Sequence, residues 1–135
     1  MSAHSPILVD TSVWIDFFAR RPGPAGSQLR SLIENAEPVV LAGIIVMEIL
    51  QGLTRDADRI ESYLSQWGLL EPDGLGTYVR AAEIFRLARS RGLALTTVDA
   101  LIAAFALDHS VRLFTLDRDF LRLSKLVPVE IFQVS

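Results

Sequence analysis

Residues 7–14 read Ile-Leu-Val-Asp-Thr-Ser-Val-Trp, and this stretch decides the fold class. Ile7–Val9 is a short apolar run that ends at Asp10, which indicates a buried strand. The apolar residues within 11–19 recur at helical spacing, so a helix is predicted directly after the strand. A buried strand that leads at once into a helix is typical of an α/β protein with a parallel sheet.

The alternation of strands and helices continues along the chain. Further strands are predicted at 39–41, 112–116 and 129–132, with a short extended segment at 69–70. Helices are predicted at 27–35, 43–53, 56–67, 78–91, 99–109 and 119–124. The Pro/Gly-rich stretches 20–26 and 72–76 are predicted to be a loop and a turn. This order predicts an α/β sandwich with a mostly parallel sheet.

Length and composition indicate one compact domain. The chain has 135 residues, of which 50% are hydrophobic and none is cysteine, and its mean hydropathy is +0.35. The absence of cysteine excludes disulfides, cysteine-zinc sites and thiol chemistry. The N-terminus lacks the pattern of a signal peptide, and the longest apolar stretch, residues 39–50, is too short to cross a bilayer. We therefore expect a soluble, cytoplasmic protein with no membrane partner.

The charge balance says little in favour of a nucleic-acid partner. Thirteen Lys and Arg residues stand against sixteen Asp and Glu residues, which gives a formal net charge of −3. This balance gives no indication of a basic tail or a polybasic anchor and argues weakly against RNA or DNA.

Several acidic residues stand where apolar residues are expected. Asp10 ends a predicted strand, and Glu48 interrupts the most apolar run of the chain. Asp99 opens an apolar helix, and Asp117 and Asp119 follow another predicted strand. Because the carboxyl ends of parallel strands share one edge of the sheet, where ligands bind, we expect Asp10 and Asp117 to meet in an acidic pocket.

Each carboxylate also has a purely structural explanation. Asp10 and Asp99 could be N-caps of the helices that follow them. Glu48 could form an ion pair with an arginine. Asp117 and Asp119 lie in a turn before a helix, where Asp is common. The joint pattern is more specific than any of its members.

An acidic pocket of this kind suits a hard divalent cation. Clustered carboxylates repel one another and stay ionised only if positive charge lies between them. Mg²⁺ or Mn²⁺ with oxygen ligands meets that need, and the scarcity of His and lack of Cys argue against zinc. Such a site suits the hydrolysis of phosphodiesters, because the metal polarises a phosphoryl oxygen and lowers the pKa of a bound water.

Four motifs in this order resemble those of the PIN-domain ribonucleases, and among them the VapC-type toxins of bacterial VapBC toxin–antitoxin modules. The motifs are ILVDTSVW at 7–14, VMEILQG at 46–52, DALIAA at 99–104 and TLDRDF at 115–120. The resemblance runs nearly end to end and implies a single PIN domain over residues 1–135. It also implies a PIN-like three-layer α/β/α sandwich with a mostly parallel central sheet of about four or five strands.

The resemblance further implies the activity and the site. The expected protein is a metal-dependent endoribonuclease that is neutralised by a cognate VapB-type antitoxin. Asp10, Glu48, Asp99 and Asp117 are then the catalytic residues and the ligands of Mg²⁺ or Mn²⁺. Asp119 would add a ligand, directly or through water, and which of Asp117 and Asp119 matters more stays open.

The resemblance implies supporting residues and partners as well. Thr11 or Ser12, and Thr115, would orient the carboxylates through hydrogen bonds, although their roles as caps or turn formers explain them equally well. The partners would be an RNA substrate, the antitoxin, and a second copy of the chain in a homodimer or a toxin–antitoxin hetero-oligomer. RNA binding is expected to rely on metal and on scattered arginines rather than on a basic face.

Two other functions are alternatives to this one. A PIN-like domain that has lost catalysis could bind an antitoxin or RNA without cutting, but the intact set of acids speaks against it. A phosphoacceptor receiver domain also places Asp at strand ends. It would need an acidic pair near the first strand and a lysine after the last strands, and the only lysine, Lys125, follows no convincing strand.

Overall fold

A computed structural model describes residues 5–134. Four strands in this part of the chain form one parallel sheet in the order β3-β2-β1-β4. Their bounds are β1 Ile7–Val9, β2 Val39–Ala42, β3 Leu69–Leu70 and β4 Arg112–Phe114. The predicted α/β fold with a parallel sheet is confirmed.

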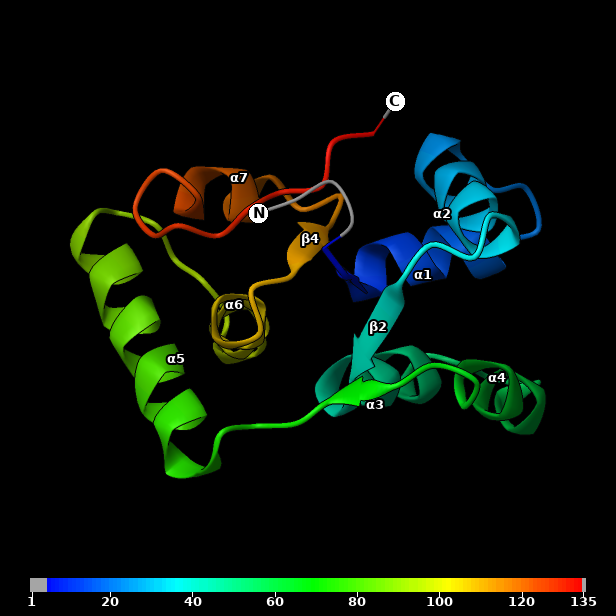
Figure 1. The fold of residues 1–135 in the computed structure, drawn as a ribbon, viewed down its shortest axis with the longest axis horizontal. Helices are drawn as coiled ribbons and strands as arrows, with labels where there is room; N and C mark the ends of the chain where they lie inside the picture. Colours follow the sequence, from blue (N-terminus) through cyan, green and yellow to red (C-terminus); the bar gives the residue numbers. More distant parts are fainter. Residues whose placement is uncertain (1–4, 135) are drawn as a thin grey trace.

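Helices connect every pair of successive strands. Their bounds are α1 Thr11–Phe18, α2 Pro24–Glu34, α3 Gly43–Gln51, α4 Ala57–Leu64, α5 Gly74–Ser90, α6 Thr97–Asp108 and α7 Arg118–Leu123. The chain first moves outward from β1 to β2 and β3, then returns through α5 and α6 to β4 on the other side of β1. Because parallel crossovers are right-handed, α1–α4 and α5–α6 cover opposite faces of the sheet. Figure 1 shows this separation, with α5 beside α6 on one side and α1 beside α2 on the other.

The core is centred on β1 and on the helices that flank it. Leu8 and Val9 are fully buried, as expected for a strand in the middle of a sheet covered on both faces. Trp14 of α1 is also fully buried, and its ring stacks on Phe18 with centroids 5.8 Å apart. Helix α6 buries six of its twelve residues, so it is nearly a core helix.

Helices α2 and α5 begin three and four residues earlier than their sequence patterns predict, and α6 begins two residues earlier. Helix α2 begins at Pro24, within the predicted loop 20–26, because proline suits the first helical position and Asp16 caps the helix. The Asp16 carboxylate accepts hydrogen bonds from the backbone N–H groups of Gly23 and Gly26 at 3.0 and 2.7 Å. Helix α5 begins at Gly74, so the turn predicted at 72–76 was wrong in its second half.

The predicted strands 112–116 and 129–132 were both too long. Strand β4 ends at Phe114, because the Thr115 hydroxyl accepts from the Asp117 N–H at 3.0 Å and starts a turn. The segment 129–132 contributes only an isolated parallel bridge between Leu113 and Ile131 rather than a full strand. Within residues 5–134, no helix has the length and apolar character needed to cross a membrane.

Candidate functional site

The topology brings Asp10 and the end of β4 together. Strands β1 and β4 are parallel neighbours, and they lie where the strand order reverses direction. In open α/β sheets the crevice at such a reversal, beyond the carboxyl ends of the strands, is the usual ligand site. The Asp10 N–H donates to the Phe114 carbonyl oxygen at 2.8 Å, and the Thr115 hydroxyl donates to Asp10 Oδ2 at 2.8 Å. The carboxyl ends of β1 and β4 therefore lie side by side, as expected.

Asp10 does not act as a side-chain helix cap. It stands at the N-cap position of α1, but its carboxylate makes no capping hydrogen bond there. Instead Oδ2 accepts from the hydroxyls of Ser12, at 3.0 Å, and Thr115. Only 6% of the residue is exposed. The carboxylate is thus held in place by hydroxyl groups from two segments that lie far apart in the sequence.

Glu48 joins the site from α3. The Thr11 hydroxyl donates to Glu48 Oε1 at 2.7 Å, which ties the first residue of α1 to the middle of α3. Among residues 5–134, no arginine lies within ion-pair distance of Glu48, so the structure does not support the ion-pair explanation of this residue.

Asp99 lies in the first turn of α6 and is half-buried. The cap of this helix is Thr96, whose hydroxyl accepts from the Asp99 N–H at 3.0 Å. Sequence reasoning missed Thr96, although a threonine three residues before an acid is the signal of a capping box. Asp99 is therefore not the N-cap, and its position in the first turn leaves its carboxylate available to the site.

The pKa values of two carboxyls show that the acids share one environment. Burial raises the pKa of Asp10 above its usual value of 3.8; the hydroxyls of Thr115 and Ser12 oppose this, and the charge of Glu48 adds to it. Burial also raises the pKa of Asp99, with further contributions from the charges of Asp117 and Asp10. The charges of neighbouring carboxylates therefore add to the effect of burial on Asp10 and Asp99, and a bound cation would relieve this.

These shifts predict how stability depends on pH in metal-free protein. A carboxyl whose pKa is raised in the folded state keeps its proton to a higher pH there than in the unfolded chain. Its contribution to the free energy of unfolding is therefore fully present below pH 3.8, the unfolded pKa, and is lost as the pH rises through the folded-state pKa. In EDTA, Asp10→Asn should thus be more stable than wild type at neutral pH, and the difference should shrink toward pH 3.8. Urea unfolding of both proteins between neutral pH and pH 3.8 measures this difference in the free energy of unfolding. A difference that does not change with pH would contradict a raised pKa for Asp10.

Asp117 and Asp119 have different surroundings. Asp117 is the N-cap of α7, and its Oδ1 accepts from the Asp119 N–H at 2.9 Å. Asp119 Oδ1 instead accepts from the Arg122 guanidinium at 3.0 Å, on a side chain that is 33% exposed. The charge of Asp117 acts on Asp99, whereas the nearest cation to Asp119 is its own helix neighbour. Asp117 is therefore the better placed of the two to act with the other acids.

The donor set fits a hard divalent cation, although the side chains are not gathered around one point. Over the described range 5–134, no three Asp, Glu or His side chains stand in positions that would hold a metal ion. All candidate ligands are carboxylate oxygens, the donors that Mg²⁺ and Mn²⁺ prefer. Burial and mutual repulsion destabilise the site without a cation.

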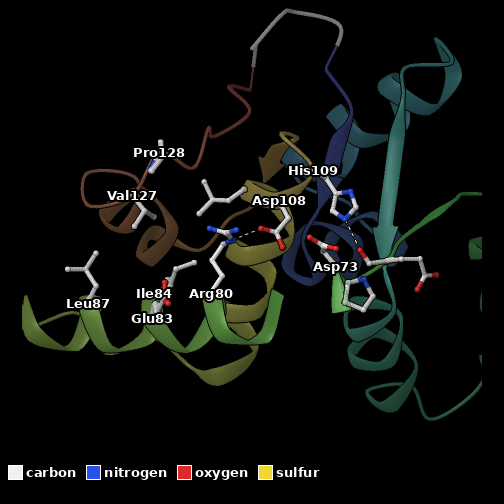
Figure 2. A pocket seen from close by; sticks show the side chains of 12 residues that line it. Asp73, Arg80, Glu83, Ile84, Leu87, Asp108, His109, Val127 and Pro128 are labelled. Atoms are coloured by element: carbon white, nitrogen blue, oxygen red, sulfur yellow. Dashed lines mark hydrogen bonds and ion pairs between the residues drawn. The ribbon is translucent and has the colours of Figure 1, made fainter. Parts of the chain in front are cut away.

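A large cavity of about 880 Å³ lies elsewhere in the molecule. Figure 2 shows its lining from α5, the end of α6 and the segment around Val127 and Pro128. Arg80 pairs with Asp108 across its wall, and the His109 ring meets the Glu71 carbonyl oxygen at 2.8 Å. None of the five predicted acids lines this cavity. Its polar contacts join α5 to α6 and the end of α6 to the segment after β3, so we assign it no part in the acidic site.

Comparisons with known proteins agree with the fold and with the motifs. The family model described as the PIN domain matches residues 7–126. Ribonuclease VapC11 of Mycobacterium tuberculosis is 34% identical over 118 residues, which cover 84% of this chain and 88% of the relative. A relative of Mycobacterium bovis, VapC ribonuclease Mb1587, matches with the same identity and coverage.

Solved structures extend the similarity to the whole architecture. A toxin–antitoxin complex from Klebsiella pneumoniae matches with a TM-score of 0.67 and 25% identity, over 93% of this chain and 99% of that one. The VapBC-1 structure from nontypeable Haemophilus influenzae matches with a TM-score of 0.74, over 95% of this chain and 97% of that one. The identity to VapBC-1 is 17%, so this second likeness concerns the fold alone.

Proposed function

Since this chain belongs to the VapC family of PIN-domain ribonucleases, we propose that it is a metal-dependent endoribonuclease and the toxin of a type II toxin–antitoxin module. The observation that carries the proposal is the electrostatic coupling of Asp10, Glu48, Asp99 and Asp117 at one edge of the sheet. Carboxyl groups with raised pKa values, such as Asp10 and Asp99, cluster at catalytic sites, which favours an enzyme over a binding module. RNA phosphodiester bonds are the proposed substrate.

The four carboxylates would hold the metal ion. Ribonucleases of this family generally depend on a divalent metal, and the choice of Mg²⁺ or Mn²⁺ is part of the proposal. When bound, the ion supplies polarisation of a phosphoryl oxygen and a more acidic water. We assign Asp10, Glu48, Asp99 and Asp117 as its ligands, with Asp119 in a lesser role.

Hydroxyl groups of the chain orient two of these carboxylates. Ser12 and Thr115 fix Asp10, and Thr11 fixes Glu48. Ser12 also accepts a hydrogen bond from the Leu116 N–H at 3.1 Å, which links α1 to the turn after β4. Such support leaves each carboxylate little freedom to turn away from a shared ligand.

One assay tests the activity and its metal requirement. The purified chain is expected to cleave RNA internally in Mg²⁺ or Mn²⁺ and to stop when EDTA is added. Cleavage undiminished by EDTA would contradict the metal mechanism. An absence of cleavage in either metal, with RNA binding retained, would contradict the enzyme and support the catalytically inactive binding module.

Removal of the Thr11 hydroxyl tests whether orientation of Glu48 matters. Thr11→Val keeps the shape of the side chain but loses the 2.7 Å bond to Glu48. We expect the rate of RNA cleavage to fall about 10- to 100-fold, as is usual for residues that orient metal ligands. Thr11→Ser retains the hydroxyl and should recover most of the rate. Equal rates for the Val and Ser variants would show that the bond does not serve the reaction.

We also propose that the chain binds a cognate antitoxin, forms a homodimer and acts in the cytoplasm. A toxin–antitoxin complex is among the structures it resembles. Exposed apolar side chains on α5 support association, since Leu75 is 77% exposed and Tyr78 and Val79 about half exposed.

Expression of the chain in bacteria should arrest growth, and co-expression of the antitoxin from the adjacent gene should restore growth. Growth that is unaffected by the active chain would contradict the toxin role.

A further inference from the structure

A groove of about 640 Å³ lies beyond the last turn of α1, between α2 and α4. We call it the arginine groove, and the side chains that define it are Phe17, Phe18, Arg30, Arg55, Arg59 and Tyr63. The three arginines come from three different parts of the chain, namely α2, the segment after α3, and α4. Three of the twelve arginines thus line one groove.

The arginine groove is positive although the whole chain is acidic. Arg59 pairs with Asp56 at 3.5 Å, and both side chains are largely exposed. Within the described part of the chain, neither Arg30 nor Arg55 has a carboxylate partner. Asp56 is the only acid among the lining residues, so the groove has an excess of two positive charges in a chain of net charge −3. Unpaired guanidinium groups of this kind favour an anionic ligand.

Aromatic rings lie directly beside these charges. The Arg30 guanidinium lies 5.4 Å from the centroid of the Phe17 ring. Tyr63 is stacked on Phe17 at 6.0 Å and meets Phe18 edge-on at 5.9 Å. Phe18 and Tyr63 are both partly exposed. Positive charge next to accessible rings is the combination that binds single-stranded nucleic acid, through phosphates and stacked bases.

Helices α1 and α3 each have one end or side chain at the acidic site and a residue at or just beyond their other end in the arginine groove. Helix α1 has Thr11, which contacts Glu48, at its start and the ring of Phe17 in its last turn. Helix α3 carries Glu48 and ends one residue before Gly52, which lines the groove. At a rise of about 1.5 Å per residue, these distances along the helix axes are roughly 6 to 9 Å. A strand of RNA can span them within about two or three nucleotides.

We propose that the arginine groove binds the single-stranded RNA that flanks the cleaved bond. Arg30 and Arg55 contact backbone phosphates, and bases pack against the exposed parts of Phe18 and Tyr63. Because the rings can stack only on unpaired bases, the groove favours single-stranded over double-stranded RNA at the acids. This inference rests on the proposed ribonuclease function, and it places RNA recognition away from the metal ligands. An acidic segment of a partner protein is the alternative occupant that the test must separate from RNA.

RNA binding is measured with a catalytically inactive variant. In an Asp10→Asn background, a fluorescein-labelled single-stranded RNA of random sequence is titrated and its anisotropy followed over a range of salt. Arg30→Gln/Arg55→Gln/Arg59→Gln is expected to weaken binding about 10- to 100-fold and to reduce the slope of log K against log salt by about 2. The matched control, Arg86→Gln/Arg89→Gln/Arg91→Gln, removes the same charge from the end of α5 and should change binding less than about threefold.

A single variant and a measurement of antitoxin binding complete this test of the groove. The single variant Arg55→Gln changes a residue outside any helix and should weaken binding in the same direction even if the triple variant does not fold. Unchanged RNA affinity in folded groove variants would overturn the inference. Loss of antitoxin binding alone, with RNA affinity intact, would overturn it too and mark the groove as a protein-docking surface. Failure of the proposed function would appear separately, as no cleavage by wild-type chain.

Discussion

Asp10→Asn is expected to lower the rate of RNA cleavage about a thousandfold or more, which corresponds to about 4 kcal/mol of activation free energy. Asp10 ends the central strand, is 6% exposed and receives two hydroxyl hydrogen bonds on one carboxylate oxygen. The amide has nearly the same shape and can accept the same bonds, but it lacks the charge that a cation needs. The loss should therefore appear in the rate and not in the folding, with cleavage followed in Mn²⁺ and stability by urea.

Asp108→Asn is the matched control for this variant. Asp108 is also well buried, with 9% of its side chain exposed, but it ends α6 and binds Thr77 and Arg80. Its replacement should lower the free energy of unfolding by about 1 to 3 kcal/mol, because a hydrogen-bonded ion pair is broken. The cleavage rate should remain within about threefold of wild type, since Asp108 lies outside the acidic cluster. Equal loss of cleavage in both variants would indicate a general defect in folding.

Asp117→Asn is expected to reduce cleavage far more than Asp119→Asn. We expect a loss of about 100-fold or more for Asp117 and less than about tenfold for Asp119, since only a direct ligand controls the charge at the reacting phosphate. The charge of Asp117 raises the pKa of Asp99, whereas Asp119 is paired with Arg122. Single-turnover cleavage in Mn²⁺ compares the two variants directly.

Arg122→Gln provides the control for this pair. It frees Asp119 from its ion pair and leaves both carboxylates in the chain. Under our assignment the cleavage rate should change little. A larger loss for Asp119→Asn than for Asp117→Asn would reverse the roles assigned to these residues.

Much of the fold could be predicted because its signals are local. The apolar run Ile7–Val9 and the helical spacing after Asp10 gave β1 and α1 nearly to the residue. Helix boundaries failed where a distant group decides them, as at α2, whose start is capped by Asp16 from the preceding helix. The segment 129–132 looks like a strand because it is apolar, yet only Ile131 pairs with the sheet.

The site could be predicted only in part. The acids were predicted as site residues because they stand where apolar residues are expected, and the parallel pairing of β1 with β4 places the ends of these two strands at one edge of the sheet. The cap at Thr96 has a local signal, because it stands three residues before Asp99, but the bond from Thr11 to Glu48 depends on which segments meet in space and did not follow from spacing. The arginine groove was missed for the same reason, because Arg30 and Arg55 are 25 positions apart in the sequence.

Calorimetric titration of Mn²⁺ into the metal-free chain tests the central claim, that these carboxylates form a metal site. Wild type is expected to bind Mn²⁺, Asp10→Asn to lose that binding, and Asp108→Asn to retain it. Because metal binding and RNA cleavage are measured separately, the result does not depend on the choice of substrate. Mn²⁺ binding that is equally strong in Asp10→Asn and wild type would contradict the claim.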